Sequence, residues 1–357
     1  MATNILITGG SGYLGGTLLD HLKNTSDLPT QGTIYALVRN EEQANKVKKS
    51  YSAEPLTLDL DDQSNITDTL LDKKISVVFF LIGAFSADNQ IRFIQALSAV
   101  QKKLGVPAHF VTTSGAKLFS SHVGHPTDRA LSDAEEGLYG IQKSSRSKFP
   151  EMQKALDGNN KVIEAAETYG VKSYIFIPCI VYGKGTGFGN PISIQTVAII
   201  RAAREMRRVY KVDKERPVWP VCHVYDTVTL YTQLLRKVLS NEPIPHNKNG
   251  YYLASSGLVA WDDLYAALAE ALAKRRVVDD AAVEEADDKS LERMAQVLGC
   301  RKEFVPVQVG GKCTLTADNG RSIGWTPKYQ PEHILEAADD EVELVLQNLD
   351  RVGNQQR

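Results

Sequence analysis

Features that this 357-residue sequence lacks exclude several classes of protein. It has no apolar run of about 18 residues and no basic, apolar leader, so we expect no membrane span, no secretion signal and a cytoplasmic location. The formal net charge of −2 gives no reason to expect nucleic acid or an anionic membrane as a partner. The 4 cysteines lie far apart without a Cys-x-x-Cys pair, which argues against a zinc site and against a disulfide framework. We therefore expect free thiols and no metal site.

The sequence does contain a glycine-rich turn close to its start. Apolar residues 5–7 predict a buried strand, and leucines at helical spacing after residue 13 predict a helix. In the turn between them, Gly9 permits a sharp bend, Gly12 lets a pyrophosphate approach the backbone, and Gly15 lets the helix pack on the strand. The helix N-terminus offers free N–H groups to phosphates, so the turn predicts a dinucleotide-binding site.

The fold class predicted from the pattern is α/β, with a Rossmann-type doubly wound parallel sheet. Strand-like and helix-like segments alternate over residues 1 to about 115, as such a sheet requires. We assign residues 1–183 to the dinucleotide-binding domain and residues 184–350 to a smaller C-terminal substrate lobe, with a segment near 220–260 that returns to the sheet. The polar tail 351–357 is expected to be disordered. In the lobe we expect helices near 192–207, 225–240, 261–273, 281–298 and 331–349.

Residues at the ends of the predicted strands indicate which cofactor binds. Arg39 ends the second strand, where an acidic residue would accept hydrogen bonds from the ribose of NAD and an arginine accommodates the 2′-phosphate of NADP. NADP(H) is therefore the preferred cofactor, with NAD(H) as the alternative. Asp59 ends the third strand and is placed to bond the adenine amino group. Gly83 and Ala84 follow the fourth strand and would let the backbone pass beside the cofactor.

Further motifs follow the glycine turn in a fixed order. They are Thr112-Thr-Ser114, Tyr139-Gly-Ile-Gln-Lys143, Pro178-Cys-Ile-Val-Tyr-Gly183, His223-Val-Tyr-Asp226 and Ile323-Gly-Trp-Thr-Pro327. Together with the turn, these motifs resemble the extended short-chain dehydrogenase/reductase family, within the NAD-dependent epimerase/dehydratase group, and in particular its fungal members. The resemblance covers residues 3 to about 345.

The resemblance implies chemical roles for matching residues. Tyr139 would be the general acid/base for a substrate oxygen, Lys143 would lower the pKa of that phenol and bond the nicotinamide ribose, and Ser114 would hold the same oxygen. With the residues named above, the expected cofactor site comprises Gly9, Gly12, Tyr13, Leu14, Gly15, Arg39, Asp59, Leu60, Gly83, Ala84, Thr112, Lys143, Pro178, Ile180 and Val181. The expected substrate pocket comprises His122, Phe188, Asn190 and Trp219.

The spacing after Tyr139 leaves two interpretations open. The distance to the next motif is about ten residues longer than the family implies, and both Pro150 and residues 157–159 signal a helix break. In one interpretation Tyr139 and Lys143 are the catalytic pair. In the other, counted back from the next motif, Pro150 and Lys154 occupy the two positions and the match is chance.

The function that we expect is that of an NADP(H)-dependent reductase or dehydrogenase acting on a carbonyl or alcohol group of a small molecule in specialised metabolism. One alternative is a redox-neutral epimerase, dehydratase or isomerase of the same fold. Another is a non-catalytic NADP(H)-sensing regulator, which the helix-breaking signals favour. The expected partner is the small-molecule substrate, and the oligomeric state stays open, a homodimer included.

Overall fold

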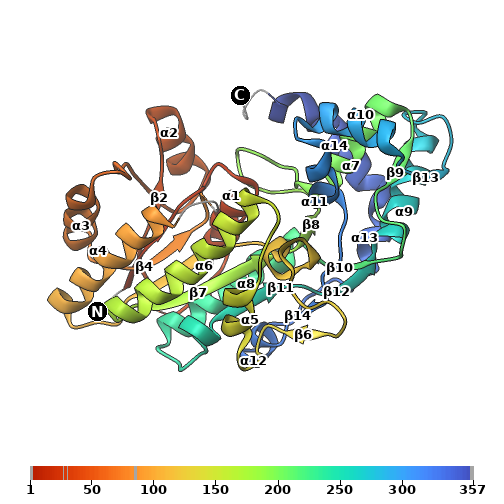
Figure 1. Cartoon of the computed structure of the whole chain (residues 1–357). Helices are drawn as coiled ribbons and strands as arrows, with labels where there is room; N and C mark the ends of the chain where they lie inside the picture. Colours follow the sequence, from red (N-terminus) through yellow and green to blue (C-terminus); the bar gives the residue numbers. More distant parts are fainter. Residues whose placement is uncertain (1–2, 27, 30, 84–86, 354–357) are drawn as a thin grey trace.

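Figure 1 shows the computed structural model of the chain, which describes residues 3–26, 28–29, 31–83 and 87–353. At its centre lies a seven-stranded sheet with the strand order β11-β7-β5-β4-β1-β2-β3, in which every neighbouring pair runs parallel. The strands are β1 (Thr3–Ile7), β2 (Gln31–Leu37), β3 (Glu54–Leu56), β4 (Ile75–Phe80), β5 (His109–Thr113), β7 (Lys172–Pro178) and β11 (Tyr251–Ala254). The predicted α/β fold class with a doubly wound parallel sheet is confirmed.

Helices cover both faces of this sheet, as two neighbouring phenylalanines of β4 show. Successive side chains of a strand point to opposite faces. Phe79 contacts Tyr231 with ring centroids 6.0 Å apart, whereas Phe80 contacts Phe93 with centroids 5.4 Å apart. Tyr231 and Phe93 belong to two helices that therefore lie on opposite faces. The helices around the sheet are α1 (Tyr13–Lys23), α2 (Glu41–Ser50), α3 (Gln63–Asp72), α4 (Asp88–Leu104), α6 (Pro150–Tyr169) and α8 (Val224–Leu239).

The helix break predicted near residues 157–159 does not occur. A short helix, α5 (Leu138–Ser144), ends well before α6, and α6 then continues for 20 residues through Asp157, Gly158 and Asn159. Pro150 is the first residue of α6, where a proline has no N–H to leave unbonded and its fixed φ suits the helix. Buried side chains on one face of α6 hold it against the sheet. Tyr139 therefore lies on α5, a different helix from α6, which packs against β7 of the sheet.

A smaller lobe lies beside the carboxyl ends of the sheet strands, at the right of Figure 1. Its three-stranded sheet has the order β12-β10-β8, where β8 is Ile180–Tyr182, β10 is Val218–His223 and β12 is Gly257–Ala260. The chain returns to the large sheet between β10 and β12, because β11 pairs with β7. Other elements of the lobe and its connections are α7 (Gln195–Met206), β9 (Val209–Lys211), α9 (Trp261–Lys274), β13 (Val283–Glu285), α10 (Asp288–Leu298), α11 (Val305–Val309), α12 (Asn319–Ser322), α13 (His333–Glu336) and α14 (Ala338–Gly353), together with the pair β6 (Leu131–Ser132) and β14 (Leu315–Thr316) and the 3-10 turns η1 (Ala116–Phe119), η2 (Ser121–Val123), η3 (Asn247–Asn249) and η4 (Lys302–Phe304).

The helix expected near 281–298 is a strand followed by a shorter helix. Residues 283–285 pair with β9, and α10 starts at Asp288 because the Asp287 side chain caps it by accepting a hydrogen bond from Ser290 N at 2.7 Å. At the C-terminus α14 extends to Gly353, and the remaining part of the predicted disordered tail, 354–357, lies outside the described residues. Among the helices that the structure describes, none has the length and apolar character needed to cross a membrane.

Candidate active site

The glycine turn has the geometry that its sequence predicts. Gly9 has φ +75°, which strongly favours glycine, and its carbonyl accepts a hydrogen bond of 2.8 Å from Gly12 N. A Cβ on Gly15 would lie 2.3 Å from Gly9 O, so α1 packs this closely on β1 because residue 15 is glycine. Gly12 is the N-cap of α1 and has no side chain to occupy the space in front of the helix. The turn thus presents a helix N-terminus to a phosphate group.

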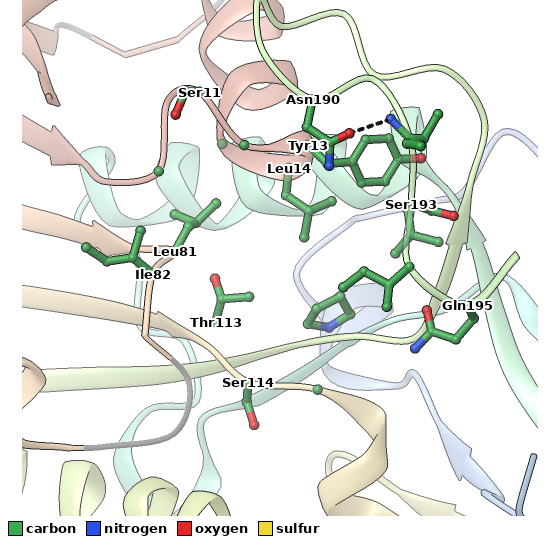
Figure 2. A pocket seen from close by; sticks show the side chains of 18 of the residues that line it. Ser11, Tyr13, Leu14, Leu81, Ile82, Thr113, Ser114, Asn190, Ser193 and Gln195 are labelled. Carbon is green, nitrogen blue, oxygen red and sulfur yellow. Dashed lines mark hydrogen bonds between the residues drawn. The ribbon is translucent and has the colours of Figure 1, made fainter. Parts of the chain in front are cut away.

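A cleft with a volume of about 1130 Å³ starts at this turn and runs between the sheet and the lobe. Figure 2 shows how side chains from both parts converge on it, with Ser11 and Leu14 on one side and Ser193 and Gln195 on the other. Its walls carry three cationic side chains, Arg39, Lys117 and Arg201, whereas no described lining residue is aspartate or glutamate. A cavity of this size and charge fits a large anionic ligand.

Arg39 stands at the outer end of the cleft beside Gln43, Leu58 and Leu60. Its side chain is exposed, and within the described part of the chain its guanidinium has no hydrogen-bond or ion-pair partner. Asp59, predicted to bond adenine, is not among the lining residues, and its carboxylate instead accepts a hydrogen bond of 3.0 Å from Asp61 N. This end of the cleft therefore offers a free cation where the sequence predicts a 2′-phosphate.

Residues 183–191, which we term the strap, cross over the start of α1. The strap contains four glycines, and three of them, Gly185, Gly187 and Gly189, pack closely on the start of α1; a Cβ on Gly189 would lie 2.0 Å from Ser11 O. Asn190 N donates a hydrogen bond of 3.1 Å to Ser11 O, and the Tyr13 hydroxyl donates one of 2.6 Å to Gly183 O. Asn190 and Tyr13 both line the cleft and are labelled in Figure 2. The strap thus holds one wall of the cleft against the glycine turn.

Ser114 lines the inner part of the cleft directly after β5. Its Oγ accepts a hydrogen bond of 2.8 Å from Asn159 Nδ2 of α6, and its backbone N–H donates to Phe176 O at 2.8 Å. From the same helix Met152 and Ala155 also line the cleft. Because the Asn159 amide donates to Ser114 Oγ, the Ser114 hydroxyl is free to donate its own hydrogen bond to another oxygen.

Tyr139 and Lys143, the pair for which the resemblance implies a catalytic role, are not among the residues that line this cleft. The Tyr139 hydroxyl donates a hydrogen bond of 2.7 Å to Glu164 Oε1, and Lys143 Nζ lies 2.6 Å from the same oxygen. Glu164 follows Ala155 by nine residues on α6, which places it about 14 Å further along the helix and on the opposite side. Burial and the Glu164 carboxylate raise the pKa of Tyr139, opposite to the change that a catalytic phenol needs.

The other predicted site residues divide into two groups. Most of the predicted cofactor residues line the cleft: Gly9, Gly12, Tyr13, Leu14, Gly15, Arg39, Leu60, Pro178 and Val181. From the predicted substrate pocket, Asn190 and Trp219 also line it. The described residues that lie outside its lining are Asp59, Gly83, Thr112, Lys143, Ile180, His122 and Phe188, and Ala84 is outside the described part of the chain.

His122 and Phe188, which the resemblance places in the substrate pocket, contact other parts of the fold and are not among the residues that line the cleft. The His122 ring makes a hydrogen bond of 3.0 Å with Gly310 O, and the Phe188 ring stacks on Tyr51 with centroids 5.4 Å apart. Both contacts join segments that are far apart in sequence. The sequence could not show them, since the partners belong to other parts of the fold.

Sequence reasoning missed Lys117 and Arg201. Lys117 follows Ser114 by one 3-10 turn in η1, and Arg201 lies on the face of α7 that carries Gln195 and Ala198 into the cleft. Burial lowers the pKa of Lys117 to about 8. The position of Lys117 so soon after Ser114 is a sequence signal that could have found it, whereas Arg201 gave no such signal.

Comparisons with known proteins agree with this geometry. A family model described as the NAD dependent epimerase/dehydratase family matches residues 5–246. No curated protein matches the sequence significantly.

Solved structures share the fold over nearly the whole chain. UDP-glucose 4-epimerase from Thermotoga maritima is 16% identical, with a TM-score of 0.62 and coverage of 97% of this chain and 100% of that chain. For dTDP-glucose 4,6-dehydratase from Bacillus anthracis the identity is 13%, the TM-score 0.64 and the coverage 97% of both chains. Vestitone reductase from alfalfa (Medicago sativa) is 15% identical, with a TM-score of 0.60 and coverage of 97% of this chain and 99% of that chain. Such identities show the shared fold alone, whereas the family model covers more than half of the sequence, so this chain belongs to the NAD-dependent epimerase/dehydratase family.

Proposed function

We propose that the protein is an NADP(H)-dependent oxidoreductase that acts on a carbonyl or alcohol group of a small molecule. The observation that carries the proposal is the continuous cleft from the glycine turn to Ser114, which has Arg39 at its outer end and no carboxylate among its described lining residues. A dinucleotide needs such a length of cleft, and its phosphates need such a charge.

The residues of the cleft fit this cofactor. The N-terminus of α1 faces the diphosphate position, and the free Arg39 guanidinium suits a phosphate on the adenosine ribose. Pro178 and Val181 supply an apolar wall near Ser114, which suits the nicotinamide ring. When bound there, the cofactor supplies or accepts a hydride.

Ser114 is the residue that we expect to hold the reacting oxygen of the substrate. The Ser114 hydroxyl donates to that oxygen, while Asn159 keeps the hydroxyl in position from behind. Asn159 is therefore a positioning residue, and Ser114 is the catalytic one. The similar structures are named as an epimerase, a dehydratase and a reductase, so the fold accommodates this reaction class together with others.

A second candidate function is that of an NADP(H)-sensing regulator without turnover. The observation that favours it is the position of Tyr139 and Lys143 on the far side of α6, because the pair that the resemblance implied is then missing from the cleft. The two candidates share the cofactor site and differ in whether NADPH is consumed.

Cofactor titration and turnover together test the proposal. Calorimetry should show NADPH binding at one site per chain, and a panel of carbonyl compounds should contain at least one that is reduced as NADPH is oxidised. Ser114→Ala should lower that turnover roughly 10- to 1000-fold with unchanged NADPH affinity. The matched control is Ser144→Ala, since Ser144 is an exposed serine whose hydroxyl bonds Ile141 O. NADPH binding without oxidation by any compound would favour the sensor, and absence of NADPH binding would refute both candidates.

A further inference from the structure

Two hydrogen-bond donors, the buried Trp219 indole and the partly buried Lys117 ammonium, line the cleft without an acceptor in the described part of the chain. The side chain of Trp219 on β10 is 2% exposed, and its Nε1 has no hydrogen-bond partner. The Lys117 ammonium in η1 also has no partner there, although it is strongly desolvated. A buried donor that lacks an acceptor costs free energy, and a buried cation costs more. Two such groups in one cleft point to a ligand that supplies the acceptor.

The two donors belong to the same region of the cleft. The His122 ring contacts the Trp219 ring, and the two ring centroids are 5.9 Å apart. Lys117 and Trp219 both line this cleft, and the charge of Lys117 lowers the pKa of His122, which burial lowers already. Lys117 and Trp219 thus approach the cleft from two different elements, η1 and β10.

The surroundings of the two donors are mostly apolar. Met152, Leu298 and Phe304 line the same cleft, and they suit the hydrocarbon part of a ligand. Arg201 on α7 is partly exposed and has no described partner, so its charge attracts an anion towards the cleft.

We propose that Lys117 and Trp219 form a carboxylate-binding subsite, so that the substrate is a small, partly apolar molecule with a carboxylate besides its reacting carbonyl or alcohol group. This inference rests on the proposed function. The ammonium binds one carboxylate oxygen and the indole N–H binds the same or the other oxygen. One buried cation balances one negative charge, whereas a phosphate dianion needs more donors than these two supply.

The experiment uses the full-length protein saturated with NADPH and a panel of oxo acids of four to twelve carbon atoms, each paired with its primary amide. Binding is measured by the quenching of tryptophan fluorescence and by thermal shift. For at least one pair we expect the acid to bind tenfold or more tightly than the amide. Lys117→Met should abolish this preference, and Trp219→Phe should weaken acid binding severalfold.

Matched controls separate the subsite from general effects. Lys161→Met removes an exposed lysine of α6, and Trp261→Phe removes an indole whose N–H bonds Gly311 O outside the cleft lining. Both should keep the preference for the acid. Equal binding of acids and amides, binding of neither, tighter binding of inorganic phosphate, or an unchanged preference in Lys117→Met would overturn the subsite. An NADPH titration without any probe tests the proposed function separately.

Discussion

Asn159 Nδ2 donates a hydrogen bond of 2.8 Å to Ser114 Oγ and so joins the middle of α6 to the end of β5. Asn159 is 7% exposed, so this contact is protected from water. The resemblance implies no role for residue 159. The structure has a neutral amide there, which fixes a serine and does not transfer protons itself.

The first prediction concerns this hydrogen bond. Asn159→Asp replaces the donor by a carboxylate, which would accept the Ser114 proton and remove the hydroxyl from the substrate oxygen. We expect turnover to fall roughly 10- to 100-fold, with NADPH affinity changed by less than about threefold. Lower pH should partly restore the rate, because a protonated carboxyl can again donate to Ser114.

Steady-state kinetics over a range of pH values would check this expectation. A rate that is low at every pH would contradict the argument about the donor direction. Asn65→Asp is the control, because Asn65 is exposed on α3 and outside the cleft lining.

The second prediction is that Arg39 selects the cofactor. Arg39→Asp removes a charge-assisted contact with the 2′-phosphate and adds repulsion, so NADPH affinity should fall by roughly 1–3 kcal/mol more than NADH affinity. Calorimetric titration of both cofactors measures this difference. Arg216→Ala is the control, since Arg216 is exposed in the lobe and pairs with Asp263 at 2.6 Å. Equal affinity of the unmodified protein for both cofactors would contradict the assignment of Arg39 as the residue that selects NADPH.

The third prediction is that Tyr139→Phe leaves catalysis intact. The substitution removes the hydroxyl that bonds Glu164, a contact that is partly exposed and expected to contribute less than about 1 kcal/mol to stability. Turnover and NADPH affinity should both stay within about twofold of the unmodified protein. A loss of turnover of about 100-fold would instead restore the catalytic role that the sequence predicts for Tyr139.

The fourth prediction uses the buried charge of Lys117. Burial lowers its pKa from 10.5 to about 8, so below about pH 8 the folded protein holds a desolvated cation near Cys300 and His122. The unfolded state binds its proton more tightly, so this group makes stability rise between about pH 8 and pH 10.5. Lys117→Met should therefore stabilise the protein at pH 7 by about 1–3 kcal/mol, an effect that shrinks at higher pH.

Denaturant unfolding of both proteins at pH 7 and pH 9.5 measures the difference. If Lys117→Met were less stable than the unmodified protein at pH 7, the lysine would have a partner within the protein. The argument that its ammonium binds a substrate carboxylate would then be weakened. Stabilisation on removal of a cleft residue is a common sign that the residue serves a ligand.

The features that the sequence predicts correctly are those decided within a few neighbouring residues. The glycine turn needs Gly9 and Gly15 for reasons of backbone geometry alone. The alternation of strand-like and helix-like segments in the sequence likewise predicts the parallel sheet, because strands buried on both faces are continuous apolar runs.

The features that the sequence does not reveal depend on contacts between distant segments. The four-residue spacing of Tyr139 and Lys143 puts both on one helix face, but no local pattern tells that this face meets Glu164. Pro150 reads as a break in a helix and instead begins one. Lys117 and Trp219 are about a hundred residues apart in sequence, and only the fold brings both of them to the lining of one cleft.

Deuterium transfer tests the central claim most directly. The protein is incubated with NADPH that carries deuterium at C4 on either face of the nicotinamide, together with the carbonyl panel, and the products are examined by mass spectrometry. The proposed function predicts that with one of the two labelled cofactors the product alcohol gains a single deuterium on its carbinol carbon as an equal amount of NADP⁺ forms. Isomerised or dehydrated substrate without net NADPH oxidation, or NADPH that stays unchanged with every compound, would contradict it.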